Sequence, residues 1–261
     1  MKLVAEGVEV RFGGVRALAG VDVDVTKGSI VGVIGPNGSG KSTLFNCFSG
    51  FVTPMSGRVV LDGKDITSMP VQRRISAGLG RTFQTPRFDP RLPVHEAVAC
   101  GFFSRSRRGI VRSLLYTPGT RRAEREVESG VADLLDRFGL AADRDEHVGQ
   151  LSLGRVRLVE VARALATGPD FLLLDEPAAG LTKDEQRLLA TQIRSCAASG
   201  VGVLLVEHNF DLVLDLCERI TVLNNGEVLT VGTSEEVAEH PDVLEAYLGV
   251  RTGDAGQEAR T

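Results

Sequence analysis

Short apolar runs, separated by glycine-rich or polar turns, give the first part of the chain a strand-rich pattern. Residues 2–34 predict strands: residues 21–25 alternate valine with aspartate, a period of two. Residues 30–34 are apolar apart from one glycine, as expected of a strand buried on both faces. A glycine-rich loop follows, residues 41–49 predict a helix, and residues 58–63 predict a strand that ends in a turn.

The second part of the chain alternates between helical and strand patterns. Residues 93–166 are rich in Arg, Glu, Leu and Ala and predict helices, and apolar residues 171–174 and 201–206 predict buried strands around a polar helix at 183–199. Asn224-Asn225-Gly226 separates two further apolar runs and predicts a hairpin. The polar residues 251–261 are expected to be flexible. The whole pattern predicts an α/β core that is interrupted by a helical segment.

Composition narrows the class of protein. The chain has 261 residues, of which 43% are hydrophobic and 25% charged, which favours a soluble globular protein within the size range of one domain. A formal net charge of -4 gives no reason to expect a nucleic-acid partner. The four cysteines and four histidines are scattered, which disfavours a disulfide framework or a metal cage and suits a reducing compartment.

The apolar runs are too short for membrane insertion. No window approaches the ~20 apolar residues that span a bilayer, and the N-terminus lacks the apolar core of a signal peptide. If the protein serves a membrane process, we expect it to do so as a peripheral subunit.

One glycine-rich loop carries a phosphate-binding pattern. The sequence G-x-x-x-x-G-K-[ST] is matched, with a threonine after it, by Gly35, Pro36, Asn37, Gly38, Ser39, Gly40, Lys41, Ser42 and Thr43. Such a loop directs backbone N–H groups and a helix N-terminus at phosphate oxygens, while Lys41 adds a cation and the Ser42 hydroxyl can ligate Mg²⁺. The alternative is a glycine-rich turn with a chance lysine. The loop alone does not distinguish an ATPase from a kinase or a GTPase.

Two carboxylates end the apolar run at residues 171–174. Asp175 is expected to hold Mg²⁺, through water, and Glu176 to polarise the attacking water as a general base. Nucleotide sites form at the ends of parallel strands in such sheets. The alternative is an ordinary strand followed by a polar turn.

With these motifs in place, the sequence resembles the ABC ATPase family. Leu151-Ser152-Leu153-Gly154-Arg155 stands where the family signature, usually Leu-Ser-Gly-Gly-Gln, opens a helix. The resemblance implies that Ser152 and Gly154 bind the γ-phosphate of ATP held by an opposite subunit, again through a helix N-terminus. Leu153 and Arg155 depart from the pattern, and a plain serine N-cap is the alternative.

Four more positions gain a role only from this resemblance. Gln84, after Arg81-Thr82-Phe83, resembles the Q-loop glutamine that touches Mg²⁺ and the attacking water and reports to the membrane partner; a surface glutamine is the alternative. His208 resembles the switch histidine that contacts the γ-phosphate, rather than a capping or core histidine. Phe12 resembles the aromatic that stacks on adenine, rather than a core aromatic. Thr182 replaces the usual D-loop aspartate, which implies a weaker or different contact across the dimer.

The resemblance covers about residues 2–249 and is closest to the ATPase subunits of branched-chain amino-acid importers. The segments that suggest this are Arg11–Gly14, Gly80–Gln84, Pro177–Leu181, Val206–Asn209 and Glu245–Gly249. Extra sequence near 102–122 resembles an insertion found in such subunits. Urea-type importers and lipopolysaccharide-export ATPases share some of these segments.

The resemblance implies a P-loop NTPase (RecA-like) core at 1–92 and 161–249, with an N-terminal antiparallel β-subdomain. An α-helical subdomain is inserted at 93–160, and 250–261 form a flexible tail. ATP and Mg²⁺ are the implied cofactors. The implied partners are integral-membrane permease subunits, a second ATPase subunit (the same or a sister chain) and, indirectly, a solute-binding protein. The implied location is the cytoplasmic face of the plasma membrane, and import is favoured over export by the resemblance alone.

Two other classes remain open at this point. A non-transport ABC ATPase of translation or DNA repair usually carries two fused units or a long coiled coil, and a P-loop kinase or regulator has no need of both Ser152 and His208. A basic stretch between Gly101 and Arg125 is either a face toward anionic lipid or the permease, or a solvated arginine-rich surface. Its arginines are Arg105, Arg107, Arg108, Arg112, Arg121, Arg122 and Arg125.

Overall fold

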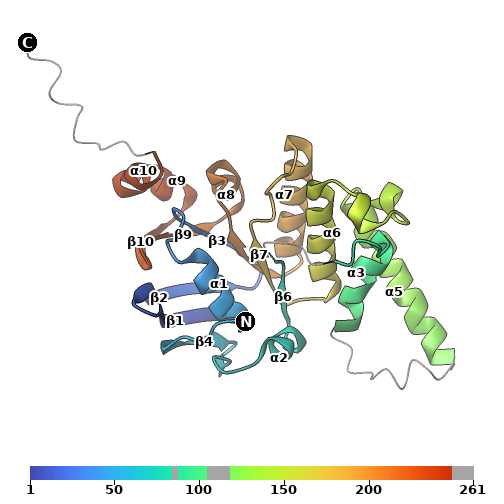
Figure 1. Ribbon diagram of the computed structural model, residues 1–261, viewed down its shortest axis with the longest axis horizontal. Coiled ribbons are helices and arrows are strands. Elements are labelled where there is room, and N and C mark those ends of the chain that lie inside the picture. Colours follow the sequence, from blue (N-terminus) through green and yellow to red (C-terminus); the bar gives the residue numbers. More distant parts are fainter. Residues whose placement is uncertain (84–87, 105–117, 249–261) are drawn as a thin grey trace, which may run out of the picture.

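Two β-sheets, with helices between and beside them, build the fold (Figure 1). The computed structural model describes residues 1–83, 88–104 and 118–248. The smaller sheet is antiparallel and has the strand order β2-β1-β4-β5. Its strands are β1 (Lys2–Phe12), β2 (Val15–Thr26), β4 (Ser56–Leu61) and β5 (Lys64–Asp65). Strands β1 and β2 confirm most of the strand pattern predicted for 2–34, and β4 confirms the strand predicted at 58–63.

The larger sheet has the order β10-β9-β3-β8-β7-β6 and is parallel except at its β10 edge. Its strands are β3 (Ile30–Ile34), β6 (Leu79–Arg81), β7 (Phe171–Asp175), β8 (Gly202–Val206), β9 (Arg219–Asn224) and β10 (Glu227–Gly232). Strands β3, β7 and β8 are buried at every position, as their continuous apolar runs predicted. These central strands end beside one another, and their ends carry the site described below.

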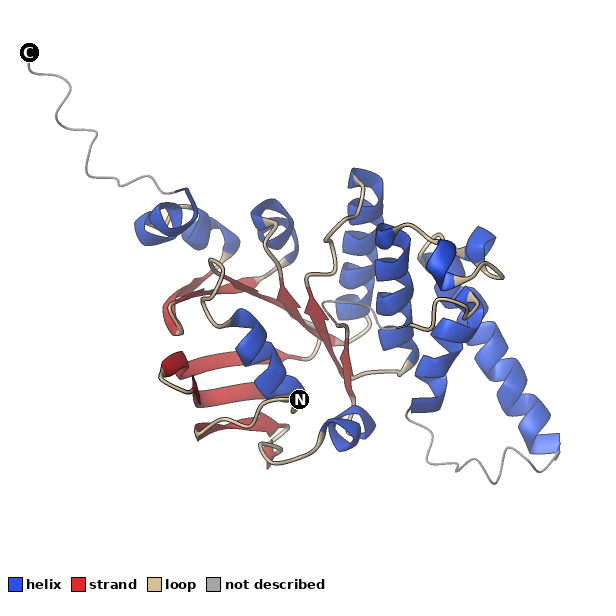
Figure 2. Ribbon diagram, in the orientation of Figure 1, coloured by secondary structure: helices blue, strands red, loops and turns tan. Residues whose placement is uncertain are grey.

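Helices cover both faces of the larger sheet (Figure 2). The α-helices are α1 (Lys41–Ser49), α2 (Val71–Ser76), α3 (Val94–Ser104), α5 (Pro118–Arg137), α6 (Leu153–Ala166), α7 (Lys183–Ala198), α8 (Phe210–Leu216), α9 (Ser234–Ala238) and α10 (Pro241–Leu248). Two 3₁₀ turns, η1 (Ala141–Asp143) and η2 (Val148–Gln150), precede α6. Within the described residues, the helical pattern predicted for 93–166 thus resolves into α3, α5 and α6.

Helix α1 lies between the two sheets, and its apolar side joins them into one hydrophobic core. Phe45 and Phe48 are at most 1% exposed there, among side chains from both sheets. The buried guanidinium of Arg74 donates to the carbonyl oxygens of Cys47 and Phe48, so it satisfies the C-terminal end of α1. A second core packs α3, α5, α6, α7 and α8 on the other face of the larger sheet. The start of α1 is therefore held firmly against the strand ends.

The predicted hairpin is confirmed between β9 and β10. Asn225 and Gly226 adopt positive φ angles of 49° and 82°, as a two-residue turn of this kind requires. Across residues 1–83, 88–104 and 118–248, none of the helices combines the length and apolar character that crossing a bilayer needs. The tail at 250–261, Gln84 and most of the basic stretch lie outside these ranges.

Candidate functional site

The phosphate-loop motif forms the connection from β3 to α1. Gly35 and Gly40 have φ angles of 152° and 105°. A Cβ at Gly35 would lie 2.1 Å from the carbonyl oxygen of Leu223, and one at Gly40 would lie 2.6 Å from that of Ala17. Only glycine fits these two positions, because the loop is pressed against the hairpin and against β2. The Gly226 N–H also donates to the Ser39 carbonyl at 3.0 Å.

Lys41 begins helix α1 at the bottom of this loop. Its ammonium donates to the carbonyl oxygens of Gly35 at 2.7 Å and Pro36 at 2.9 Å, so the side chain folds back over the loop. Burial lowers the pKa of Lys41, whereas the charges of Glu176 and Asp175 raise it. A buried cation among loop N–H groups, at a helix N-terminus, is suited to bind phosphate oxygens. Ser42 and Thr43 are the next residues of the helix and face the same cleft.

Asp175 ends strand β7 and is 5% exposed. Its N–H donates to the Thr82 hydroxyl at 3.0 Å, and Thr82 N–H donates to the Leu173 carbonyl at 2.9 Å, so the exit of β6 is tied to β7. Burial, and next the charge of Glu176, raise the pKa of Asp175. Within the described residues its Oδ1 atom is buried without a hydrogen-bond partner. A buried carboxylate oxygen without a hydrogen-bond partner is the kind of oxygen ligand that Mg²⁺ prefers.

Glu176 and His208 meet at the ends of neighbouring strands β7 and β8. Glu176 Oε1 lies 2.7 Å from His208 Nε2. The Glu176 backbone has a φ of 48°, which is unusual for a residue with a side chain, and its N–H donates to the Val206 carbonyl at 2.8 Å. Residues held in such a conformation cluster at functional sites. The two side chains that the sequence analysis assigned to hydrolysis therefore contact each other directly.

A cleft of about 390 Å³ opens over the loop and this pair. It is lined by Val15, Arg16, Ala17, Asn37, Gly38, Gly40, Lys41, Ser42, Thr43, Glu176, His208 and Asn225. The predicted residues that line this one cavity are Asn37, Gly38, Gly40, Lys41, Ser42, Thr43, Glu176 and His208. Asp175 is buried and does not line the cleft, while the Pro36 carbonyl accepts from Lys41 and the Ser39 carbonyl from Gly226.

Four lining residues were missed by the sequence analysis: Val15, Arg16, Ala17 and Asn225. Val15, Arg16 and Ala17 come from the start of β2, which no local motif marks, and Asn225 comes from the hairpin turn, whose motif predicts a turn but not its place at the cleft. Phe12 is the partner of Val15 across the β1–β2 turn and is 54% exposed, so the core alternative for this aromatic is wrong. Its strand partner Val15 lines the cleft.

The signature segment begins helix α6, as predicted, but does not line the described cleft. The Ser152 hydroxyl accepts from the Arg155 N–H at 3.3 Å and is the N-cap. Gly154 packs closely, since a Cβ there would lie 2.9 Å from Glu185 Oε2 and 3.1 Å from the Gly180 carbonyl. Leu153 is 60% exposed. The helix start presents an exposed N-terminus of the kind that binds anions.

Two of the three departures from the family pattern, Arg155 and Thr182, have local partners. Arg155 Nε donates to Asp143 Oδ2 at 2.6 Å, and its Nη2 donates to the Gly139 carbonyl at 2.8 Å, so Arg155 fastens α6 to the chain that leads into it. Thr182 is the N-cap of α7 and forms a reciprocal capping box with Glu185.

Gln84 lies outside the described residues, but the residue before it is firmly held. Phe83 N–H donates to Glu160 Oε1 at 2.7 Å, and the Phe83 carbonyl accepts from Arg157 Nη1 at 3.0 Å. Both partners lie on α6. The guanidinium of Arg81 stacks on the rings of Phe83 and Phe51 at 4.6 Å, and burial lowers the pKa of Arg81 to about 10.

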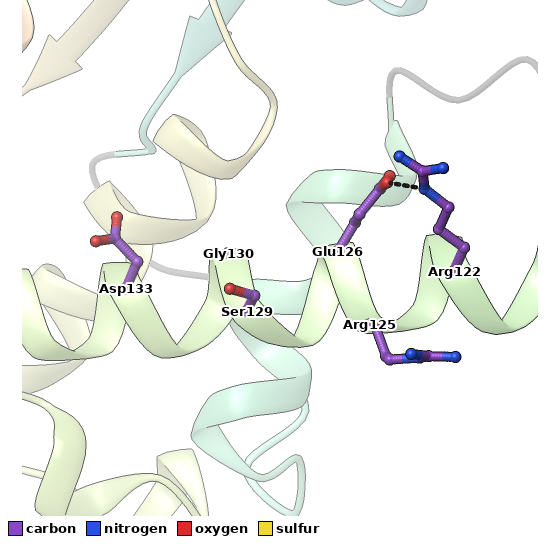
Figure 3. A pocket seen from close by; sticks show the side chains of 6 residues that line it. All are labelled: Arg122, Arg125, Glu126, Ser129, Gly130 and Asp133. Carbon is purple, nitrogen blue, oxygen red and sulfur yellow. Dashed lines mark hydrogen bonds and ion pairs between the residues drawn. The ribbon is translucent and has the colours of Figure 1, made fainter.

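A second hollow lies along α5, away from the predicted site residues (Figure 3). Figure 3 shows Arg122 reaching toward Glu126, at 3.1 Å, while Arg125 points to the other side of the helix. Asp133 also lines this hollow. The side chains that line the hollow therefore carry both positive and negative charges, as on a solvated surface. Arg105, Arg107, Arg108 and Arg112 lie outside the described residues, and so does the side chain of Arg121.

Comparison with known proteins agrees with the geometry. The family model described as ABC transporter matches residues 18–179, and that described as branched-chain amino acid ATP-binding cassette transporter matches residues 227–252. A high-affinity branched-chain amino acid transport ATP-binding protein, BraF of Pseudomonas aeruginosa, is 38% identical over 95% of this chain and 97% of its own length. The lipopolysaccharide export system ATP-binding protein LptB of Acidithiobacillus ferridurans is 37% identical over 88% of this chain and 89% of its own.

A solved structure supports the same conclusion. A crystal structure of a nucleotide-free ATP-binding cassette from an ABC transporter is 34% identical, with a TM-score of 0.82 over 96% of this chain and 100% of that one. The chain therefore belongs to the ATP-binding proteins of ABC transporters, in the branched-chain amino acid transport family.

Proposed function

We propose that this chain is the ATP-hydrolysing subunit of an ABC importer for branched-chain or related amino acids. The observation that carries the proposal is one cleft that holds the phosphate loop, Lys41 and the Glu176–His208 pair. These are the groups that ATP hydrolysis requires: an anion cradle, a base and a polar partner for the base.

Binding would rest on the loop and its neighbours. The loop N–H groups, the N-terminus of α1 and Lys41 would hold the phosphates, and Lys41 would exchange its bonds to Gly35 and Pro36 for phosphate oxygens. Phe12, which is exposed and pairs with the cleft residue Val15, would stack on the adenine. Ser42, Asp175 and Gln84 would hold Mg²⁺, which when bound would neutralise the charge on the outer phosphates. The unpartnered Oδ1 of Asp175 supports that assignment.

Hydrolysis would depend on Glu176 as the base. Its carboxylate would accept a proton from the attacking water, and His208, 2.7 Å away, would orient that carboxylate and contact the γ-phosphate. Because Glu176 Oε1 and His208 Nε2 already touch, part of the catalytic geometry is formed by the fold itself.

The helical part of the chain would serve the assembly. Ser152 and Gly154 lie at an exposed helix N-terminus outside the cleft and would bind ATP held by a second ATPase subunit, the same chain or a sister chain. We propose that residues 93–160 form the subdomain that meets integral-membrane permease subunits, with a solute-binding protein acting indirectly. The subunit would lie on the cytoplasmic face of the plasma membrane as a peripheral protein.

The proposed solute is inferred from sequence similarity to known transport proteins. BraF and the C-terminal family model at 227–252 both favour branched-chain amino-acid transport. Lipopolysaccharide export is the second candidate, because LptB is 37% identical. Nothing in the cleft would contact a transported solute, so solute choice would belong to the permeases and the binding protein.

Replacing the base tests the hydrolytic part of the proposal. Glu176→Gln should retain ATP binding and slow hydrolysis at least ~10²-fold, the usual contribution of a general base. Lys41→Ala should instead weaken ATP binding. ATP affinity by fluorescence titration and phosphate release should be measured on both, with the exposed Glu239→Gln as a matched control. Wild-type turnover in Glu176→Gln would refute the role of Glu176.

Purification from membranes tests the transport part. The tagged chain should bring down integral-membrane permeases, and vesicles holding that complex should take up leucine only with ATP on the side of this subunit. Recovery with lipopolysaccharide-export components, and no amino-acid uptake, would favour the second candidate.

A further inference from the structure

Glu207 is a buried acid to which the sequence analysis gave no role. It follows β8, directly before His208, and is 3% exposed. Its Oε1 accepts from the Ala178 N–H at 2.7 Å, and its Oε2 accepts from the N–H groups of His208 at 3.1 Å and Asn209 at 3.5 Å. One carboxylate therefore binds the loop after β7 and the loop after β8.

These bonds frame the Glu176–His208 pair. On one side of Glu176, its own N–H binds the Val206 carbonyl; on the other, the Ala178 N–H binds the Glu207 side chain. Residues 176–178 are thus fastened at both ends to consecutive residues of the neighbouring strand end. The same carboxylate fixes the backbone of His208, whose imidazole meets Glu176.

The backbone of Glu176 explains why such fastening is needed. Its φ of 48° is a conformation that costs a residue with a side chain free energy and persists only where its surroundings enforce it. The bond between Ala178 and Glu207 is one of the two that enforce it from β8. Without it, the loop after Glu176 is free to relax toward ordinary backbone angles, and Glu176 Oε1 then moves relative to His208 Nε2.

We propose that Glu207 is a positioning residue for ATP hydrolysis: its buried carboxylate locks the loops after β7 and β8 together and so sets the contact between Glu176 and His208. The inference deepens the proposed function, on which its catalytic consequence rests. Glu207 lines no part of the described cleft, so it acts through its neighbours and not on ATP.

An ionised carboxylate suits this position, because both its oxygens only accept hydrogen bonds. Burial, and also the charge of Glu176, raise the pKa of Glu207 above its ordinary value, although the bonds from Ala178, Asn209 and His208 oppose this shift. A glutamine has the same shape but one acceptor oxygen, so its NH₂ group would face an N–H donor on one of the two loops. Glu207→Gln thus unlocks one loop without opening a cavity.

The test compares Glu207→Gln, His208→Ala and the double variant, with Glu239→Gln as the control. We expect Glu207→Gln to lower kcat about 10-fold or more and to leave ATP affinity within about 3-fold, since Glu207 does not reach the cleft. In the His208→Ala background we expect Glu207→Gln to change kcat less than about 2-fold, because both substitutions disable the same contact. A merely structural role predicts independent effects that multiply, and kcat near that of wild type in Glu207→Gln overturns the proposal.

Hydrogen exchange of the full chain supplies a readout without ATP. Glu207→Gln should speed exchange of the Ala178 or His208 amide while the exchange of α1 stays unchanged. Unchanged exchange at both amides shows that Glu207 does not hold the loops, and this overturns the inference whatever the kinetics. If instead exchange rises but His208→Ala and Glu176→Gln hydrolyse ATP normally, the proposed roles of His208 and Glu176 fail, and with them the catalytic half of this inference, while the lock itself stands.

Discussion

Glu160→Gln tests whether helix α6 holds Phe83, the residue before the proposed Q-loop glutamine Gln84. Glu160 is 1% exposed, and its Oε1 accepts from the Phe83 N–H at 2.7 Å, one residue before Gln84. Two guanidinium groups of the same helix flank the carboxylate: Arg157 at 3.9 Å and Arg163 at 3.7 Å. Burial raises the pKa of Glu160, and the Phe83 bond and the arginines lower it. The substitution keeps the shape of the side chain and removes its charge.

The expected loss of folding free energy in Glu160→Gln has two parts. Replacing a charged acceptor by an amide weakens the bond to Phe83 by about 1 kcal/mol, since charge-assisted bonds contribute ~1.5–3 kcal/mol and neutral ones ~0.5–1.5. The arginines also lose their carboxylate. A fully buried pair broken this way costs ~3–5 kcal/mol, but these pairs are long and the Arg163 side chain is 22% exposed, so we expect only about 1–2 kcal/mol from them. The total is about 2–3 kcal/mol.

Chemical and thermal unfolding of the full chain measure this loss. For a protein of this size it corresponds to roughly 4–12 °C in Tm. Glu124→Gln, an exposed glutamate of α5, is the control and should stay within about 0.5 kcal/mol of wild type. Exchange of the Phe83 amide should also rise in Glu160→Gln. If Glu160→Gln matches the control in stability and in Phe83 exchange, α6 does not hold Phe83.

Three more predictions follow from single contacts. Arg155→Gln should lose the bonds to Asp143 and the Gly139 carbonyl and destabilise the chain by about 1–3 kcal/mol, whereas stability equal to wild type in urea unfolding would mean that these bonds are exchanged for water at no cost. Thr182→Val should cost about 1 kcal/mol by removing the N-cap of α7, and Thr182→Asp should restore it, as circular dichroism melts would show. Burial raises the pKa of Cys47 and of Cys217 to about 12, so at pH 8 only about one in 10⁴ of these thiols is ionised. A thiol reagent should therefore modify exposed Cys100 fast in the native chain and all four cysteines only in denaturant; rapid native labelling of Cys47 would contradict its burial.

Elements could be predicted from the sequence where a few adjacent residues meet all the physical requirements of the structure. Continuous apolar runs predicted β3, β7 and β8, because a strand covered on both faces has to be apolar at every position. The Asn225-Gly226 turn was predictable because few residues tolerate its backbone angles. The same holds for the phosphate loop, in which Gly35 and Gly40 meet other backbone too closely for any side chain.

Elements and contacts could not be predicted where they depend on residues that are far apart in the sequence. Strand β6 is three residues long, too short to show a period, and is recognisable only beside β7. Arg16 and Asn225 line the cleft because two hairpin ends lie over the loop, which no motif encodes. Glu160 and Glu207 did leave a trace, since Glu160 is a single acid within an apolar run and Glu207 is an acid that directly follows one. Their partners, Phe83 and Ala178, could not be inferred from that trace alone.

The two buried glutamates suggest how the atypical sequence keeps its geometry. Glu207 ties the end of β7 to the end of β8, and Glu160 ties the signature helix to the residue before Gln84. Both bonds run from a side chain to backbone N–H groups, so they constrain loops whatever side chains those loops carry. Arg155 and Thr182, the residues that depart from the family pattern, likewise hold local backbone: one fastens the start of α6 and the other caps α7. Arg155 and Thr182 therefore retain helix positions inside the subunit, and any effect of the atypical sequence on function should appear at exposed Leu153, at the start of α6, where we propose that a second subunit binds.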